Sequence, residues 1–168
     1  LKTEQALDRA INEPEEGNRK TLAVVALHNG EVIAERYAKG IERNTPLLGW
    51  SMSKSATATL AGVMARRGEV ELTARGAVDS PATPEITLEH LLRMSSGLAI
   101  DERNDGTDPS SLMLWSSPDM AKFAASRPQR HAPGEVFDYM SGSTNLAMRH
   151  LQNQLGPDPK SQVLAETG

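Results

Sequence analysis

Hydrophobic side chains recur at helical spacing through one segment of the first half of the chain. They stand at Met52, Ala56, Leu60, Val63 and Met64, and Gly68 follows. Positions three and four apart lie on one face of a helix, and a glycine just past the last turn readily adopts the left-handed conformation that ends it. The pattern predicts an amphipathic helix over residues 49–67 with these side chains on its buried face.

The chain before this segment shows two other patterns. Ala6, Leu7, Ala10 and Ile11 share one side of a predicted helix over residues 1–12, which Pro14 and the polar residues 15–18 end. Residues 21–27 and 31–37 are rich in Val, Ile and Leu and flank Asn29-Gly30, a pair typical of tight hairpin turns. We expect an antiparallel hairpin with the helix packed on it.

Shorter helices are predicted further along. Thr87 is a typical N-cap for a helix over residues 88–94, with Leu88, Leu91 and Leu92 facing inward. Ser117-Pro118-Asp119 predicts the start of another helix, which carries Met120, Phe123 and Ala124. Residues 133–134 predict a turn, residues 136–139 a short extended piece, and helical spacing resumes over residues 146–155 before Gly156-Pro157.

Residues 101–111 are acidic and contain glycine. Carboxylates gathered in a loop can bind a metal ion, but this segment lacks the regular alternation of a calcium loop. We therefore predict a solvated surface loop and no metal site. Met113 and Trp115, which follow it, suit either the core or the wall of a binding site.

Composition narrows the classes of function. The chain has 168 residues and 38% hydrophobic residues, which is enough for one ordinary core, so we expect a single domain over residues 1–168. A net charge of -4 with interspersed signs offers no basic face for nucleic acid and no polybasic membrane patch.

The residue types exclude further classes. Without cysteine there is no thiolate nucleophile, and no apolar run reaches the length of a membrane span. The four histidines are scattered, and we expect structural roles for His90 and His150. The expected ligand is a small molecule.

The start of the helix predicted over residues 49–67 carries the candidate catalytic residues. Ser51 and Lys54 stand three residues apart and therefore share a helix face. A serine hydroxyl is a poor nucleophile until a base takes its proton, and a neutral lysine can be that base. Taken alone the Ser-x-x-Lys pattern is weak, because a surface helix with a solvated lysine has the same spacing.

Three blocks in one order resemble the serine-reactive β-lactamase superfamily. They are LLGWSMSKS at residues 47–55, LLRMSSGL at residues 91–98 and PGEVFDYMSG at residues 133–142. Within the superfamily the chain is most similar to class C β-lactamase-related hydrolases, the branch that holds 6-aminohexanoate-dimer hydrolase, esterases and D-alanyl-D-alanine carboxypeptidases. The resemblance spans roughly residues 21–155 and implies an α+β fold (an α/β sandwich), an antiparallel sheet flanked by helices.

The resemblance also implies roles for individual residues. Ser51 would be the nucleophile, Lys54 the base, Tyr139 a base or the proton donor to the leaving group, and Ser141 a supporting hydroxyl; Trp115 lies in a loop that borders the substrate cleft in the family. Ser141 replaces the asparagine of true β-lactamases, which favours esters or linear amides over β-lactams. The reaction would be acyl transfer in two steps through an acyl-enzyme on Ser51, with no metal or organic cofactor.

The sequence leaves two other functions open. One is a non-catalytic module of the same fold that binds peptides or a protein partner, and the other is a penicillin-binding carboxypeptidase or β-lactamase. Acylation of Ser51 separates the first from an enzyme, and stable acylation by a penicillin identifies the second.

The C-terminal part departs from the family pattern. The family has a third block on a strand that supplies a second oxyanion N–H, and this chain reaches only Glu166-Thr167-Gly168. The excursion at residues 69–85 is also short. We therefore expect an incomplete domain without the C-terminal sheet strands, or one completed by a second polypeptide. Loss of one oxyanion donor costs about a hundred- to thousandfold in rate. Family members are often exported, so an exported or periplasmic location is favoured over a cytoplasmic one.

Overall fold

The computed structural model describes residues 2–12, 20–80 and 83–156. They fall into two compact units, which we call the first unit (Leu1–Leu48) and the second unit (Gly49–Gly168). The predicted helix stop at Pro14, the stop at Pro157 and the C-terminal tripeptide lie outside the described residues.

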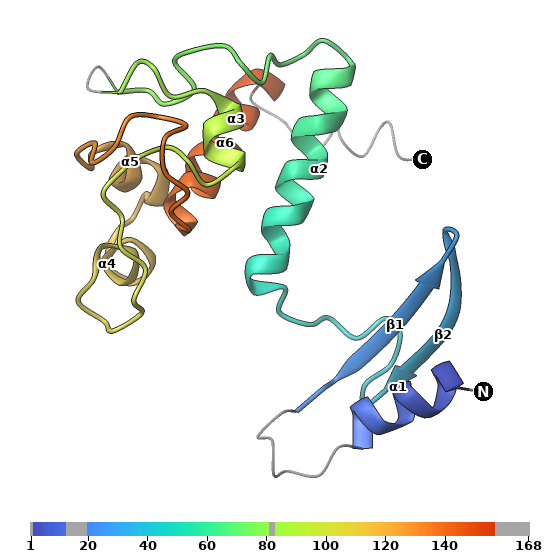
Figure 1. Ribbon diagram of the computed structural model, residues 1–168. Coiled ribbons are helices and arrows are strands. Elements are labelled where there is room, and N and C mark those ends of the chain that lie inside the picture. Colours follow the sequence, from blue (N-terminus) through green and yellow to red (C-terminus); the bar gives the residue numbers. More distant parts are fainter. Residues whose placement is uncertain (1, 13–19, 81–82, 157–168) are drawn as a thin grey trace. The chain divides into compact units, whose positions relative to one another are not determined.

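The first unit is a helix packed on a β-hairpin (Figure 1), as the sequence predicts. Helix α1 covers Lys2–Asn12, and the antiparallel strands β1 and β2 cover Ala23–His28 and Glu31–Tyr37. Asn29 and Gly30 form the turn with φ angles of 50° and 83°, the left-handed region that tight hairpin turns need. Leu7 and Ala34 are buried, and Arg36 binds both Glu4 and Asp8 of α1. Ala6 is exposed, so it lies beside the buried face and not on it.

The second unit is helical. Its elements are the 3-10 helix η2 (Trp50–Met52) and the α-helices α2 (Ser53–Arg66), α3 (Leu88–Leu92), α4 (Pro109–Ser116), α5 (Met120–Ala125) and α6 (Ser141–Leu155). Helix α6 contacts each of α2, α3, α4 and α5, so the other helices gather around it (Figure 1). The fully buried side chains include Met64, Leu88, Leu91, Met113 and Leu151, one or two from each of several helices.

The buried face of α2 differs from the predicted one. Met64 is buried, as predicted. Met52 is 72% exposed and Ala56 is exposed, whereas Thr57 and Ala61, which lie outside the predicted stripe, are buried. Helix α2 packs against α6. Ala61 and Met64 belong to the same buried core as Leu146, Ala147 and Leu151 of α6, so packing against this core and not the hydrophobic stripe selects the buried face.

One helix and two helix ends differ from the predictions. Helix α4 was not predicted, although Asp108 accepts hydrogen bonds from the N–H groups of Ser110 and Ser111 and Pro109 fills the first helical turn, both common start signals. Helix α6 begins at Ser141 and not at residue 146, and α3 ends at Leu92, whose side chain is only half-buried. Residues 136–139, predicted as a short extended piece, belong to no helix or strand.

No helix in the described ranges combines the length and the apolar character that crossing a membrane requires.

Candidate active site

Ser51 lies in the short 3-10 helix that leads into α2. The N–H of Met52 donates to the Gly49 carbonyl at 2.9 Å, and the Ser53 hydroxyl donates to the Trp50 carbonyl at 2.6 Å. Trp50 has a φ of 43°, which is uncommon for a bulky residue. These bonds close the turn and leave the Ser51 side chain exposed.

Two side chains from different parts of the second unit meet at the Ser51 hydroxyl. Lys54 Nζ, one turn along α2, donates to Ser51 Oγ at 3.1 Å. The Tyr139 hydroxyl, which lies 88 residues away in the sequence, donates to the same oxygen at 2.7 Å. Lys54 Nζ also lies 5.1 Å from the centre of the Tyr139 ring, within cation–π range. The structure therefore brings together three of the residues expected from the sequence.

Ser141 and Glu102 extend this network. Lys54 Nζ donates to Ser141 Oγ at 3.1 Å. The Ser141 hydroxyl donates to Glu102 Oε1 at 2.9 Å, and the Ser141 backbone N–H donates to Glu102 Oε2. Ser141 is thus where the sequence predicts a supporting hydroxyl. Glu102 was missed, because it stands in the acidic segment that was predicted to be a solvated loop.

The segment that carries Tyr139 is held by the second motif block. The Gly134 N–H donates to the Ser95 carbonyl at 2.7 Å, and the Asp138 N–H donates to the Met94 carbonyl at 2.8 Å. The buried Ser96 hydroxyl lies 3.0 Å from that of Ser143 in the first turn of α6. Residues 94–96 therefore place Tyr139 and the start of α6 beside Ser51.

A cavity of 440 Å³ opens next to the nucleophile. Its lining includes Trp50, Ser51, Lys54, Glu102, Leu114, Met120, Ser141 and Asn145. Met113 is fully buried and belongs to the core, whereas Trp115 is 78% exposed, so the core position considered for Trp115 is wrong. Trp115 does not line this cavity; Leu114 and Met120 do.

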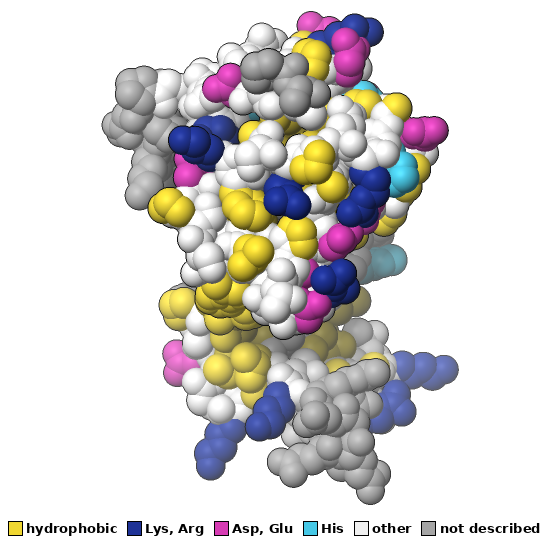
Figure 2. Space-filling model, turned by 90° about the vertical axis from the view of Figure 1, so that its left-hand side faces the viewer, with side chains coloured by type: hydrophobic (Ala, Val, Ile, Leu, Met, Phe, Trp, Pro, Cys, Tyr) yellow, Lys and Arg dark blue, Asp and Glu magenta, His cyan; other side chains and the backbone are white. Residues whose placement is uncertain are grey.

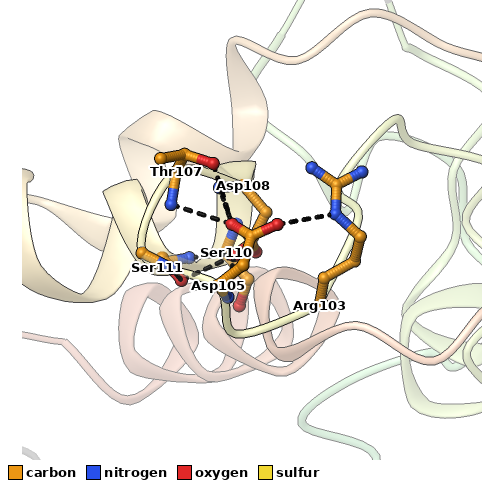
Figure 3. A network of polar contacts seen from close by, with 7 residues as sticks. Arg103, Asp105, Thr107, Asp108, Ser110 and Ser111 are labelled. Carbon is orange, nitrogen blue, oxygen red and sulfur yellow. Dashed lines mark hydrogen bonds and ion pairs between the residues drawn. The ribbon is translucent and has the colours of Figure 1, made fainter.

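The acidic loop holds a network of hydrogen bonds and an ion pair, which Figure 3 shows. Asp108 is buried at 1% exposure and accepts a hydrogen bond from the Ser111 hydroxyl at 2.6 Å, which lowers its pKa. The pKa of Asp105 is also low, because the Thr107 backbone N–H and then Arg103 hydrogen-bond to its carboxylate. The described residues contain no group of three or more His, Cys, Asp or Glu side chains placed to hold a metal ion.

Two histidines lie on helices of the second unit. His90 completes the N-terminal cap of α3, since its N–H donates to the Thr87 hydroxyl at 3.1 Å while its Nδ1 accepts from the Thr87 N–H at 3.3 Å. His150 is half-buried on α6, and burial lowers its pKa. Neither histidine contacts Ser51.

Two of three comparisons with known proteins found matches. A family model described as Beta-lactamase matches residues 7–163. A search of curated proteins found no match. Among solved structures 13 chains match. One is a Bacillus anthracis protein named provisionally as a 6-aminohexanoate-dimer hydrolase, with a TM-score of 0.62, 21% sequence identity and coverage of 82% of this chain. The match spans 42% of that protein's own chain. At 21% sequence identity the likeness shows the fold alone.

Proposed function

The chain belongs to the Beta-lactamase family, and from that premise we propose that it is a serine hydrolase that cleaves an ester or amide bond through an acyl-enzyme on Ser51. One observation carries the proposal: Ser51 Oγ lies within hydrogen-bond distance of both Lys54 Nζ, at 3.1 Å, and the Tyr139 hydroxyl, at 2.7 Å. A nucleophile between two groups that can exchange protons with it is what acyl transfer needs.

The proposed first step is attack by Ser51 on the substrate carbonyl. Neutral Lys54 takes the proton of the Ser51 hydroxyl while Oγ forms a bond to the carbonyl carbon. When the tetrahedral intermediate collapses, the bond to the leaving group breaks, and Tyr139 passes its proton to the leaving oxygen or nitrogen and recovers one from Lys54. Water then attacks the acyl-enzyme by the same proton transfers in reverse and releases the acid.

The start of the helix supports this step electrostatically. Ser51 lies in η2, which continues directly into α2, so its backbone N–H is close to the positive end of the helix dipole. That N–H is the proposed donor to the oxyanion that forms during attack.

The substrate class follows from the cavity and from Ser141. The cavity combines the polar Glu102, Asn145 and Ser141 with the apolar Leu114 and Met120, which suits a small molecule with both characters. Because Ser141 stands where true β-lactamases have asparagine, we propose an ester or linear amide. The similar Bacillus anthracis protein is named as a hydrolase of a 6-aminohexanoate dimer.

The experiment is covalent labelling with a fluorophosphonate, followed by intact mass and peptide mapping. The wild-type protein should gain one adduct, and Ser51→Ala should lose labelling and hydrolysis by about ten-thousandfold or more. The matched control is Ser55→Ala, because Ser55 is an exposed serine one turn along α2 and should label like the wild type.

A second pair of variants tests the proton donor. Tyr139→Phe removes the hydroxyl that lies 2.7 Å from Ser51 Oγ and should slow labelling by about a hundred- to ten-thousandfold. Tyr37→Phe, in the hairpin, is its control. Labelling of Ser51→Ala at the wild-type rate would contradict the assignment. Substrate binding without acylation would instead favour a binding module, and stable acylation by a penicillin would favour the penicillin-binding alternative.

A further inference from the structure

We propose that Glu102 is a positioning residue that orients Lys54 through Ser141. This inference rests on the proposed function, since it explains how the base is held against the nucleophile. It assigns Glu102 a role that neither its place in an acidic loop nor the Ser-x-x-Lys motif indicates.

The direction of each hydrogen bond in this chain is determined by chemistry. A serine hydroxyl has one proton with which to donate a hydrogen bond. Because a carboxylate can only accept, the Ser141 hydroxyl uses this proton in its hydrogen bond to Glu102 Oε1, at 2.9 Å. The Ser141 oxygen is therefore left as an acceptor, and it faces Lys54 Nζ at 3.1 Å. Glu102 thus ensures that Ser141 accepts from Lys54 and does not donate to it.

The direction of the hydrogen bond between Lys54 and Ser141 matters when the lysine amine is neutral. Neutral lysine has two N–H bonds and one lone pair, and only the lone pair can take the proton from Ser51. In the structure Lys54 Nζ donates to Ser51 Oγ and to Ser141 Oγ, each at 3.1 Å. When the amine is neutral and one N–H stays on Ser141 Oγ, its lone pair can turn toward Ser51 Oγ. If Ser141 instead donated to Lys54, the lone pair would be occupied and the base would be blocked.

Glu102 also caps the helix that carries Ser141. Met140, the N-cap of α6, makes no side-chain cap bond, and the Ser141 N–H donates to Glu102 Oε2. A carboxylate is favourable at a helix N-terminus. One side chain therefore fixes both the backbone and the hydroxyl of Ser141, so a test must separate the capping role from the orienting role.

The neighbouring charges are engaged elsewhere. Asp101 pairs with Arg130 at 2.8 Å, and Arg103 pairs with Asp105 at 2.9 Å. Glu102 alone of these three consecutive charged residues contacts Ser141, and it lines the cavity beside Ser51. Asp101 therefore offers a control with the same charge on the same loop.

Glu102→Gln separates the two roles. The amide oxygen of glutamine can still accept the Ser141 N–H and preserve the cap, while its NH₂ group faces the Ser141 hydroxyl as a donor. The hydroxyl then accepts from the amide, and its proton, no longer held by a carboxylate, can turn toward Lys54. We expect an unchanged Tm and labelling of Ser51 that is slower by about ten- to a hundredfold. Glu102→Ala should lose rate and also lower the Tm.

A double-mutant cycle tests whether Glu102 acts through Ser141. Glu102→Gln, Ser141→Ala and their combination should show strong coupling, with the double variant labelled no more slowly than the slower single variant. Asp101→Asn should be labelled at about the wild-type rate. Additive losses, or an equal loss in Asp101→Asn, would overturn the proposal because they would indicate a general effect of charge or loop structure.

An NMR measurement tests, independently of activity, whether Glu102 orients Lys54. In protein with ¹⁵N-labelled lysine, the Lys54 Nζ resonance is assigned by its loss in Lys54→Arg. It should move in Glu102→Gln and in Ser141→Ala and stay in place in Asp101→Asn. An unmoved resonance in Glu102→Gln would refute the positioning role. If the wild type fails to label at all, the proposed hydrolase function fails, and the resonance still reports whether Glu102 orients Lys54.

Discussion

At the scale of single residues, one loop uses two carboxylates in different ways. Glu102 reaches across to Ser141, whereas Asp108 stays within its own segment and starts α4. Both oxygens of Asp108 are engaged: Oδ1 accepts the Ser110 N–H at 3.1 Å, and Oδ2 accepts the Ser111 hydroxyl at 2.6 Å and the Asp105 N–H at 3.1 Å (Figure 3). A buried carboxylate is tolerated only when it is hydrogen-bonded in this way.

The lowered pKa of Asp108 predicts a dependence of stability on pH. Its pKa is lower in the folded protein, mainly because the Ser111 hydroxyl hydrogen-bonds to the carboxylate, so the unfolded chain binds the proton more readily. Stability should therefore be lost as the pH falls through the ordinary aspartate value of about 3.9 and below. Asp105, whose pKa is also lowered, contributes in the same direction.

Thermal unfolding followed by circular dichroism between neutral and acidic pH measures this effect. Asp108→Asn should lower the Tm at neutral pH and flatten its fall in acid. Asp79→Asn removes the same charge at an exposed position and should keep the wild-type slope. An acid slope in Asp108→Asn as steep as that of the wild type would contradict the prediction.

At the scale of elements, the turn after α3 supports the segment that carries Tyr139. Gly97 is central to it: its carbonyl accepts the Arg130 N–H at 2.7 Å, and its φ is 76°. A Cβ at this position would lie 2.1 Å from the His131 carbonyl oxygen, which no side-chain rotation can relieve. The glycine allows two loops to approach more closely than any other residue would permit.

Gly97→Ala should therefore destabilise the second unit and slow acylation together. The left-handed conformation alone costs about 1–2 kcal/mol for a residue with a Cβ, and displacement of residues 130–132 adds to this. The measurement is a denaturant titration combined with the labelling rate.

The matched control for this variant is Gly62→Ala on α2. A Cβ there meets nothing within 4 Å, so alanine should be neutral or stabilise the helix by about 0.5–1 kcal/mol. If Gly97→Ala were as stable and as reactive as Gly62→Ala, the close approach of residues 97 and 131 would not support the site.

At the scale of the whole molecule, the two units differ in how much apolar surface they bury. In the described part of the first unit the buried hydrophobic residues are Leu7 and Ala34, whereas Leu27, Val32 and Ile33 of the hairpin are at least 50% exposed. The second unit holds the extended core of helices α2 to α6. Figure 2 shows hydrophobic side chains at the surface of the molecule.

This difference predicts unequal protection from hydrogen exchange. A two-stranded hairpin is marginally stable in water, and local opening is easiest where few apolar contacts are broken. Backbone amides of β1 and β2 should exchange at least about a hundredfold faster than those of α6 after correction for intrinsic rates. Exchange measured by NMR or mass spectrometry checks this, and equal protection of both units would show that the hairpin gains stability from contacts beyond its own unit.

Several features were predictable because neighbours in the sequence determine them. The Asn29-Gly30 hairpin, the Thr87 cap and the pairing of Ser51 with Lys54 depend on residues within a few positions of one another. Local dihedral preferences and helical periodicity express such features directly. Helix α4 belongs to the same class, but the acidic composition of residues 101–111 concealed its Asp-Pro start.

The sequence by itself therefore determined the local elements, the Ser-x-x-Lys pair and, through three motif blocks, the family. Only the tertiary structure decided which face of α2 is buried and which distant groups reach the nucleophile. Tyr139 lies 88 residues from Ser51, and Glu102 lies 39 residues from Ser141. Contacts at such separations depend on how α3, α6 and their connecting loops pack, and local periodicity in the sequence does not predict that packing. This is why the motif indicated Tyr139, whereas Glu102 was found only once the helices were in place.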